Sequence, residues 1–186
     1  MAIALNDREA ERLNDSIVDK NDSEKLNEII RKAELLLGNI GVRVDSGDIV
    51  FEIVDEKEMA RQYPQRTAVG LTCPIRIEGK KHKIWLLTNL PYIYLLSVVA
   101  HEMGHTWCRD KHIVYNEFVE EGLCELFAYH ILTTQLSKLG NAWKETMLNN
   151  PDPIYGDGFR YMKKQLESRG NSWFKLLGFI KMMYKE

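Results

Sequence analysis

The order of the predicted elements indicates an α+β fold, because the strands, with helices among them, occupy the first half of the chain and helices alone occupy the second. The chain has 186 residues, a length that fills one hydrophobic core and leaves little for another. Neither an internal repeat nor a linker rich in proline or glycine interrupts it. We therefore predict one domain over residues 23–186, preceded by a polar segment, residues 1–22, that is disordered or forms a short helix.

The first half of the chain is predicted to hold a helix and a small sheet. Apolar residues recur at helical spacing over Glu24–Leu37, and Gly38 and Gly41 follow as signals of a helix end. A short helix is expected before Pro64. Runs of β-branched, aromatic and other apolar residues predict the strands Ile49–Val54, Thr67–Thr72, Ile75–Ile77 and Lys83–Thr88, the last two joined by a turn.

The second half of the chain is predicted to be helical. Asn89-Leu90-Pro91 marks a helix start, because proline is tolerated in the first turn, and this helix is expected to extend to about Arg109. It is apolar on nearly every side, so we expect it to be buried. A second helix is expected from its cap, Asn116, to Leu139. Two further helices are expected near residues 158–168 and 172–184.

Composition and charge exclude several classes of protein. The net charge of −2 and the pI near 6.2 give no indication of nucleic acid as a partner. The longest apolar run, Tyr92–Ala100, is too short to cross a bilayer, so we expect no membrane span. The three cysteines show no paired spacing, and the N-terminus lacks the apolar core of a signal peptide. We therefore expect a cytoplasmic protein; the sequence carries no indication of oligomeric state.

The segment His101-Glu102-Met103-Gly104-His105 falls inside the predicted buried helix. Residues four apart on a helix differ by about 40° in direction and about 6 Å in height, so both imidazoles can bind one metal ion. Glu102 lies about 100° from His101, within reach of a water on that metal. The alternative is a chance pair of histidines, but three unpaired polar groups in an apolar helix would be costly to bury. The pattern therefore predicts one zinc ion per chain, with Glu102 as a general base.

A catalytic zinc usually has three protein ligands, and the third is expected from the helix that follows. The candidates are Glu117, Glu120, Glu121 and Glu125. Glu121 and Glu125 are four apart and share a face, so we favour Glu121 as the ligand and expect Glu125 to bind the outer nitrogen of a histidine. Glu125 remains the alternative ligand. Glu117 and Glu120 are interpreted as solvated charges near the helix start.

Three segments follow one another in the chain: AHEMGHTW at residues 100–107, VEEGLC at residues 119–124 and YGDGFR at residues 155–160. The first two resemble the gluzincin pattern, in which a glutamate before a glycine on a second helix completes the zinc site. All three together resemble the peptidase domain of the plant LIM-domain proteins that limit organ size and are activated by ubiquitin. The resemblance covers roughly residues 65–180. Because the sequence carries neither a LIM zinc module nor a ubiquitin-interacting helix, we expect a stand-alone peptidase domain and do not carry over regulation by ubiquitin.

The resemblance implies a zincin-like fold, with a small, mostly antiparallel sheet packed on the active-site helix. It also implies a zinc metallopeptidase that acts on peptide or protein substrates, with zinc held by His101, His105 and Glu121 and with an edge strand that aligns the substrate. Together with the spacing it favours hydrolysis by a zinc-activated water, with Glu102 as the base.

Two residues of the third segment are candidates for further roles. The phenol of Tyr155 can donate to the developing oxyanion, although a tyrosine packed in a glycine-rich turn is an equal alternative. Arg160 can bind a substrate carboxylate or brace the loop at Asp157.

Two other functions stay open at this point. One is a binding module that keeps its metal for stability without turnover, against which Glu102 speaks because a structural site needs no base. The other is a zinc hydrolase of a non-peptide amide.

Overall fold

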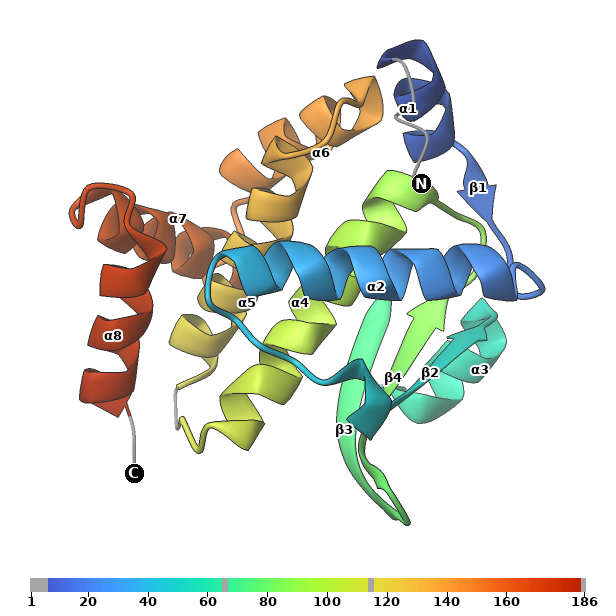
Figure 1. Ribbon diagram of the computed structural model, residues 1–186, viewed down its shortest axis with the longest axis horizontal. Coiled ribbons are helices and arrows are strands. Elements are labelled where there is room, and N and C mark those ends of the chain that lie inside the picture. Colours follow the sequence, from blue (N-terminus) through green and yellow to red (C-terminus); the bar gives the residue numbers. More distant parts are fainter. Residues whose placement is uncertain (1–6, 65–66, 114–115, 185–186) are drawn as a thin grey trace.

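The computed structural model describes residues 7–64, 67–113 and 116–184 and confirms the α+β class (Figure 1). In Figure 1 the sheet of β2, β3 and β4 lies to the right of the long helix α4, and helices α6, α7 and α8 lie to its left. The helices are α1 (Asp7–Asn14), α2 (Ser23–Asn39), α3 (Glu56–Gln62), α4 (Tyr92–Asp110), α5 (Glu117–Thr133), α6 (Lys138–Leu148), α7 (Tyr155–Glu167) and α8 (Trp173–Tyr184), with a 3-10 turn at Ser46–Asp48. The strands are β1 (Ile17–Val18), β2 (Ile49–Val54), β3 (Gly70–Ile77), β4 (Lys80–Leu87) and β5 (Leu90–Pro91).

The main sheet has the strand order β2-β4-β3. β2 pairs with β4 in parallel, and β3 pairs with β4 in antiparallel, so β3 forms one edge of the sheet. A second, two-stranded antiparallel sheet joins β5 to β1 of the polar N-terminal segment, in which α1 also lies. Residues 1–6 of that segment fall outside the described ranges.

The prediction of two strands at Thr67–Thr72 and Ile75–Ile77 was wrong, because β3 continues through Pro74 with a shift of register before Ile77. The Leu87 amide donates to the Val69 carbonyl, so alternation along the strand turns the main chain of residues 70, 72 and 74 toward the open edge. A proline at such a position removes no hydrogen bond from the sheet.

Helix α4 lies at the centre of the core, as its apolar sequence predicts. It packs against β3 and β4 on one side, against α2, and along α5. Tyr92, Leu95, Leu96, Val99 and Met103 of this helix are fully buried. No helix in the described ranges is long and apolar enough to span a membrane.

The helix predicted from Asn116 to Leu139 is in fact two helices. The Asn116 side chain caps α5 by accepting from the Val119 amide, but α5 ends at Thr133. The Ser137 side chain then accepts from the Gly140 amide and starts α6, which the sequence analysis missed. Gly140 therefore lies in the first turn of a helix and does not end one.

Candidate metal centre

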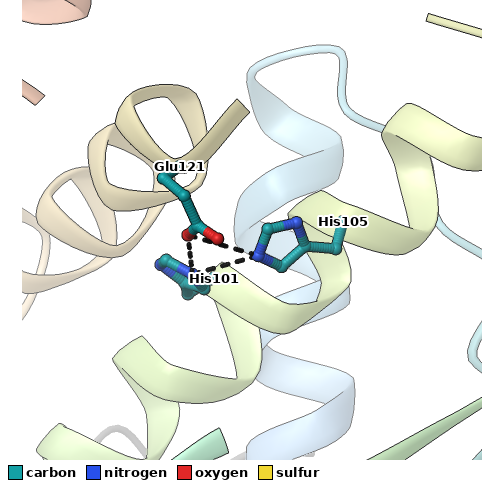
Figure 2. Close-up of side chains that lie close together, drawn as sticks. All are labelled: His101, His105 and Glu121. Carbon is teal, nitrogen blue, oxygen red and sulfur yellow. Dashed lines mark hydrogen bonds and ion pairs between the residues drawn. The ribbon is translucent and has the colours of Figure 1, made fainter. Parts of the chain in front are cut away.

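Helix α4 brings His101 and His105 to one face, with Nε2 of each ring directed at the other (Figure 2). The two Nε2 atoms are 3.2 Å apart. Both side chains are nearly buried, with exposed fractions of 13% for His101 and 12% for His105. The helical spacing that predicted a shared metal thus produces two nitrogen atoms that converge on one point.

Glu121 reaches the same point from α5, which lies along α4 (Figure 2). Its Oε2 atom is 3.2 Å from Nε2 of His101 and 3.5 Å from Nε2 of His105. Gly104 allows the helices to approach this closely, because a Cβ there would lie 2.8 Å from Sγ of Cys124. Glu121 Oε2 is buried and has no hydrogen-bond partner in the described ranges.

The carboxylates of Glu120 and Glu125 hold the outer nitrogens of the two histidines. Nδ1 of His105 lies 2.7 Å from Oε1 of Glu120, and Nδ1 of His101 lies 3.2 Å from Oε1 of Glu125. Glu125 thus lies at a histidine's outer nitrogen, as expected, whereas the interpretation of Glu120 as a solvated charge was wrong. Because the two helices run antiparallel, Glu120, which precedes Glu121 on α5, faces the turn of α4 that carries His105. The sequence could have signalled this only through the pair of adjacent glutamates.

These contacts leave a cluster that fits a cation. An ionised carboxylate only accepts, so each Nδ1 carries a proton, and each ring turns a lone pair on Nε2 inward once a metal displaces the proton there. Two lone pairs and one carboxylate oxygen then face each other. Ligand atoms about 2.0–2.1 Å from a tetrahedral zinc lie about 3.3 Å apart. The separations of 3.2, 3.2 and 3.5 Å therefore match three corners of such a site.

The electrostatics of the metal-free cluster point the same way. Burial alone would lower the pKa of His101 and His105, but the carboxylates beside them raise the pKa of His101 well above its usual value and that of His105 to about 9. Burial would raise the pKa of Glu121, yet the two histidines hold it well below its usual value. Without metal, protons therefore supply the positive charge that the cluster needs, and a bound metal would displace them.

The carboxylate of Glu102 rests against β3. It is 6% exposed, and the Thr72 hydroxyl donates to its Oε2 atom at 2.6 Å. Gly70 lies beside the other oxygen, since a Cβ on Gly70 would be 2.6 Å from Oε1 of Glu102 and 2.7 Å from Cγ1 of Val98. β3 thus fixes one carboxylate oxygen and leaves room for the other. No local sequence pattern predicts these roles of Gly70 and Thr72.

A cleft of about 690 Å³ passes over the cluster. Helix α4 forms its floor and, together with α5, α6 and the start of α7, its helical wall; residues 67–72 form its strand wall. The open edge of β3 lines the cleft with the main chain of Gly70 and Thr72, and the Thr72 carbonyl accepts from the Arg109 guanidinium at 3.3 Å.

Tyr155 and Arg160, the two candidate residues of the segment at residues 155–160, lie in different surroundings. Tyr155 lines the cleft at the start of α7. Arg160 is not among the lining residues, because its guanidinium donates to the carbonyls of Leu148 and Asn150 and to the carboxylate of Asp157. Arg160 therefore braces the loop before α7, which was the second of the two roles considered for it.

Comparison with known proteins places the chain in a family. The chain is 30% identical to Protein DA1 of Arabidopsis thaliana, in an alignment that covers 41% of this chain and 20% of that protein. It therefore matches only about a fifth of the length of this curated relative. No solved structure matches the chain significantly. The model of the DA1-like family matches residues 49–141, which include both histidines, Glu102 and Glu121 and make up half of the 186 residues. The chain belongs to the DA1-like family.

Proposed function

We propose that this protein is a zinc metallopeptidase that hydrolyses peptide bonds in its cleft. The observation that carries the proposal is the convergence of His101, His105 and Glu121 beside a carboxylate, Glu102, that is not one of the three converging groups. Zinc, when bound by these three residues, would acidify a water molecule and polarise a carbonyl oxygen. A purely structural zinc site has no use for a fourth, separately seated carboxylate.

Glu102 would act as the general base and acid. Its Oε2 atom is held by Thr72, so Oε1 can take a proton from water and return it to the leaving amine. The short hydrogen bond and the tight space around the carboxylate limit its rotation, and a fixed base loses less free energy in reaching the reactive geometry.

The chain also offers groups that would hold and polarise an extended peptide. Main-chain groups at the open edge of β3 can pair with the peptide as an added strand. The phenol of Tyr155, which lines the same cleft, would donate to the carbonyl oxygen as it becomes negative.

The test is zinc content by elemental analysis together with cleavage of an unfolded protein such as casein, for the wild type and Glu102→Gln. We expect about one zinc per chain in both proteins, and loss of cleavage by a factor on the order of 100 or more in the variant. Zinc without cleavage of proteins or peptides by the wild type would favour a binding module, and cleavage of acyl-amino acids alone would favour a hydrolase of non-peptide amides. Undiminished cleavage by Glu102→Gln would rule out the base.

A further inference from the structure

The two ends of the cleft differ in chemistry. Because α4 and α5 are antiparallel, the pair His105–Glu120 lies at one end of the metal cluster and the pair His101–Glu125 at the other. Beyond the first pair the cleft is lined by the charged residues Arg109 and Glu117. Beyond the second pair most of the lining is apolar or aromatic, with Ser97, Thr146 and Asn150 as its polar members, and helix α6 contributes to it.

Three helices build the apolar end. Val98 of α4 lies one turn before His101, and Ala128 of α5 lies one turn after Glu125; they are 6% and 5% exposed. Met147 of α6 is equally buried, at 6%. Tyr94 and Trp143 are half-buried, and their ring centroids are 4.0 Å apart at an angle of 50°. These residues line the end of the cleft that begins one helical turn from the metal cluster, and we call this end the apolar recess.

The polar groups at this end do not change its character. Burial, together with the nearby Glu125, raises the pKa of Tyr94 to about 12, so its phenol is neutral at physiological pH. Ser97 lines the recess, but its hydroxyl donates to the carbonyl of Tyr94 at 2.7 Å. Of the charged side chains that line the cleft, Glu125 is the one on the turn that borders the recess, and it contacts Nδ1 of His101.

We infer that this recess, formed by Tyr94, Val98, Ala128, Trp143 and Met147, binds a large apolar or aromatic side chain next to the scissile bond of the substrate. The inference rests on the proposed peptidase function and names a substrate class for it. An extended peptide paired with β3 directs alternate side chains toward the floor of the cleft, and the one nearest the recess would be buried between α4 and α6. A glutamate at that position would meet apolar walls and the carboxylate of Glu125.

The test is cleavage of a peptide series in which the residues on each side of the scissile bond are varied among Phe, Leu, Ala and Glu. In the wild type we expect kcat/KM about 10-fold or more higher with Phe or Leu than with Ala at one of the two positions, and lowest with Glu. Trp143→Leu removes one of the two aromatic rings of the Tyr94–Trp143 pair, so the preference for Phe over Ala should fall several-fold. Trp85→Leu is the matched control, because Trp85 is also half-buried but stacks on Lys83 outside the cleft lining. It should leave the preference unchanged.

A second variant and a binding measurement keep the inference testable if Trp143→Leu does not fold. Ala128→Leu fills the recess from α5 and should lower the preference in the same direction. Calorimetric titration of Glu102→Gln with uncleaved Phe and Ala peptides should show tighter binding of the Phe peptide.

The two proposals fail in different ways. Cleavage without a preference for apolar residues, or an equal loss with every peptide in Trp143→Leu, would overturn the recess and leave the peptidase intact. Tighter binding of the Phe peptide without any cleavage would support the recess and refute the peptidase. Neither binding nor cleavage of any peptide would overturn both.

Discussion

The cleft has a helical wall, built by α5 along α4, and a strand wall, built by β3, and these walls contribute to the site in different ways. The helical wall supplies the groups that would hold the metal, together with the carboxylates of Glu120 and Glu125 that orient them. The strand wall contributes no such group. Gly70 gives Glu102 its space, and Thr72 gives it a hydrogen bond.

This difference predicts which measured property, zinc binding or turnover, a substitution on each wall should change. A substitution on the helical wall removes a ligand or loosens one, so it should change zinc content or affinity. A substitution on the strand wall displaces a carboxylate that does not bind the metal, so it should change turnover and leave zinc in place. The four variants below test that separation, from the largest expected effect to the smallest.

Glu121→Ala should have the largest effect, because it removes one of the three converging atoms and leaves two imidazole lone pairs facing each other. We expect loss of zinc and of all cleavage, measured by elemental analysis and a casein assay on the folded protein. Glu125→Ala is the matched control, since it removes a carboxylate of the same face and should retain zinc with weaker affinity. The reverse result would make Glu125 the ligand.

Gly70→Ala should displace the carboxylate of Glu102 from its position against the strand wall. The added methyl would lie 2.6 Å from Oε1 of Glu102, so either the carboxylate or the strand must move. A displacement of about 1 Å can lower a rate on the order of 100-fold. We expect a fall of that size in kcat with zinc content unchanged. Gly178→Ala, in α8, controls for the general effect of a methyl group, since nothing lies within 4 Å of a Cβ at Gly178 and its φ is not positive. Loss of zinc in Gly70→Ala would show that the two walls are not separable.

Glu120→Gln tests whether the carboxylate of Glu120 on the helical wall contributes to zinc affinity. It keeps the size of the side chain but replaces the carboxylate that contacts Nδ1 of His105 at 2.7 Å. Loss of such a partner typically weakens metal affinity about 10- to 100-fold. Competition with a chelator of known zinc affinity measures this, and Glu117→Gln, one turn earlier on α5, gives the comparison for a general change of charge. Equal zinc affinities in Glu120→Gln and Glu117→Gln would show that the contact between Glu120 and His105 does not contribute to metal binding.

Thr72→Val should have the smallest effect. It preserves the shape of the side chain and removes the hydroxyl that donates to Glu102 at 2.6 Å. A hydrogen bond to a charged group is worth about one to two powers of ten in an equilibrium, so we expect kcat to fall about 10-fold while KM and zinc content hold. Thr72→Ser should restore most of the rate. If Thr72→Val raised KM and left kcat unchanged, Thr72 would act on substrate and not on Glu102.

The helical wall was largely predictable from the amino-acid sequence. The pairing of His101 with His105, the position of Glu102 beside them, and the shared face of Glu121 and Glu125 all follow from the helical repeat, which is a local property. Asn116 was also identified as the cap of α5, since capping uses a side chain within three residues of the amide that it holds. The order of the elements, with the strands in the first half of the chain and helices alone in the second, predicted the α+β class from local patterns as well.

The strand wall and the closure of the cleft were decided only by tertiary packing. Thr72 meets Glu102 across 30 residues of sequence, and Glu120 meets His105 across the contact between α4 and α5. No periodicity of one segment encodes either pair. Helix α6, which contributes Trp143 and Met147 to the cleft lining, was not predicted, because Gly140 resembles a helix end unless the Ser137 cap before it is recognised. The sequence by itself determined which groups one helix presents together, because turns repeat along the chain. The folded core determined which of these groups meet a partner, because that depends on how closely the elements approach.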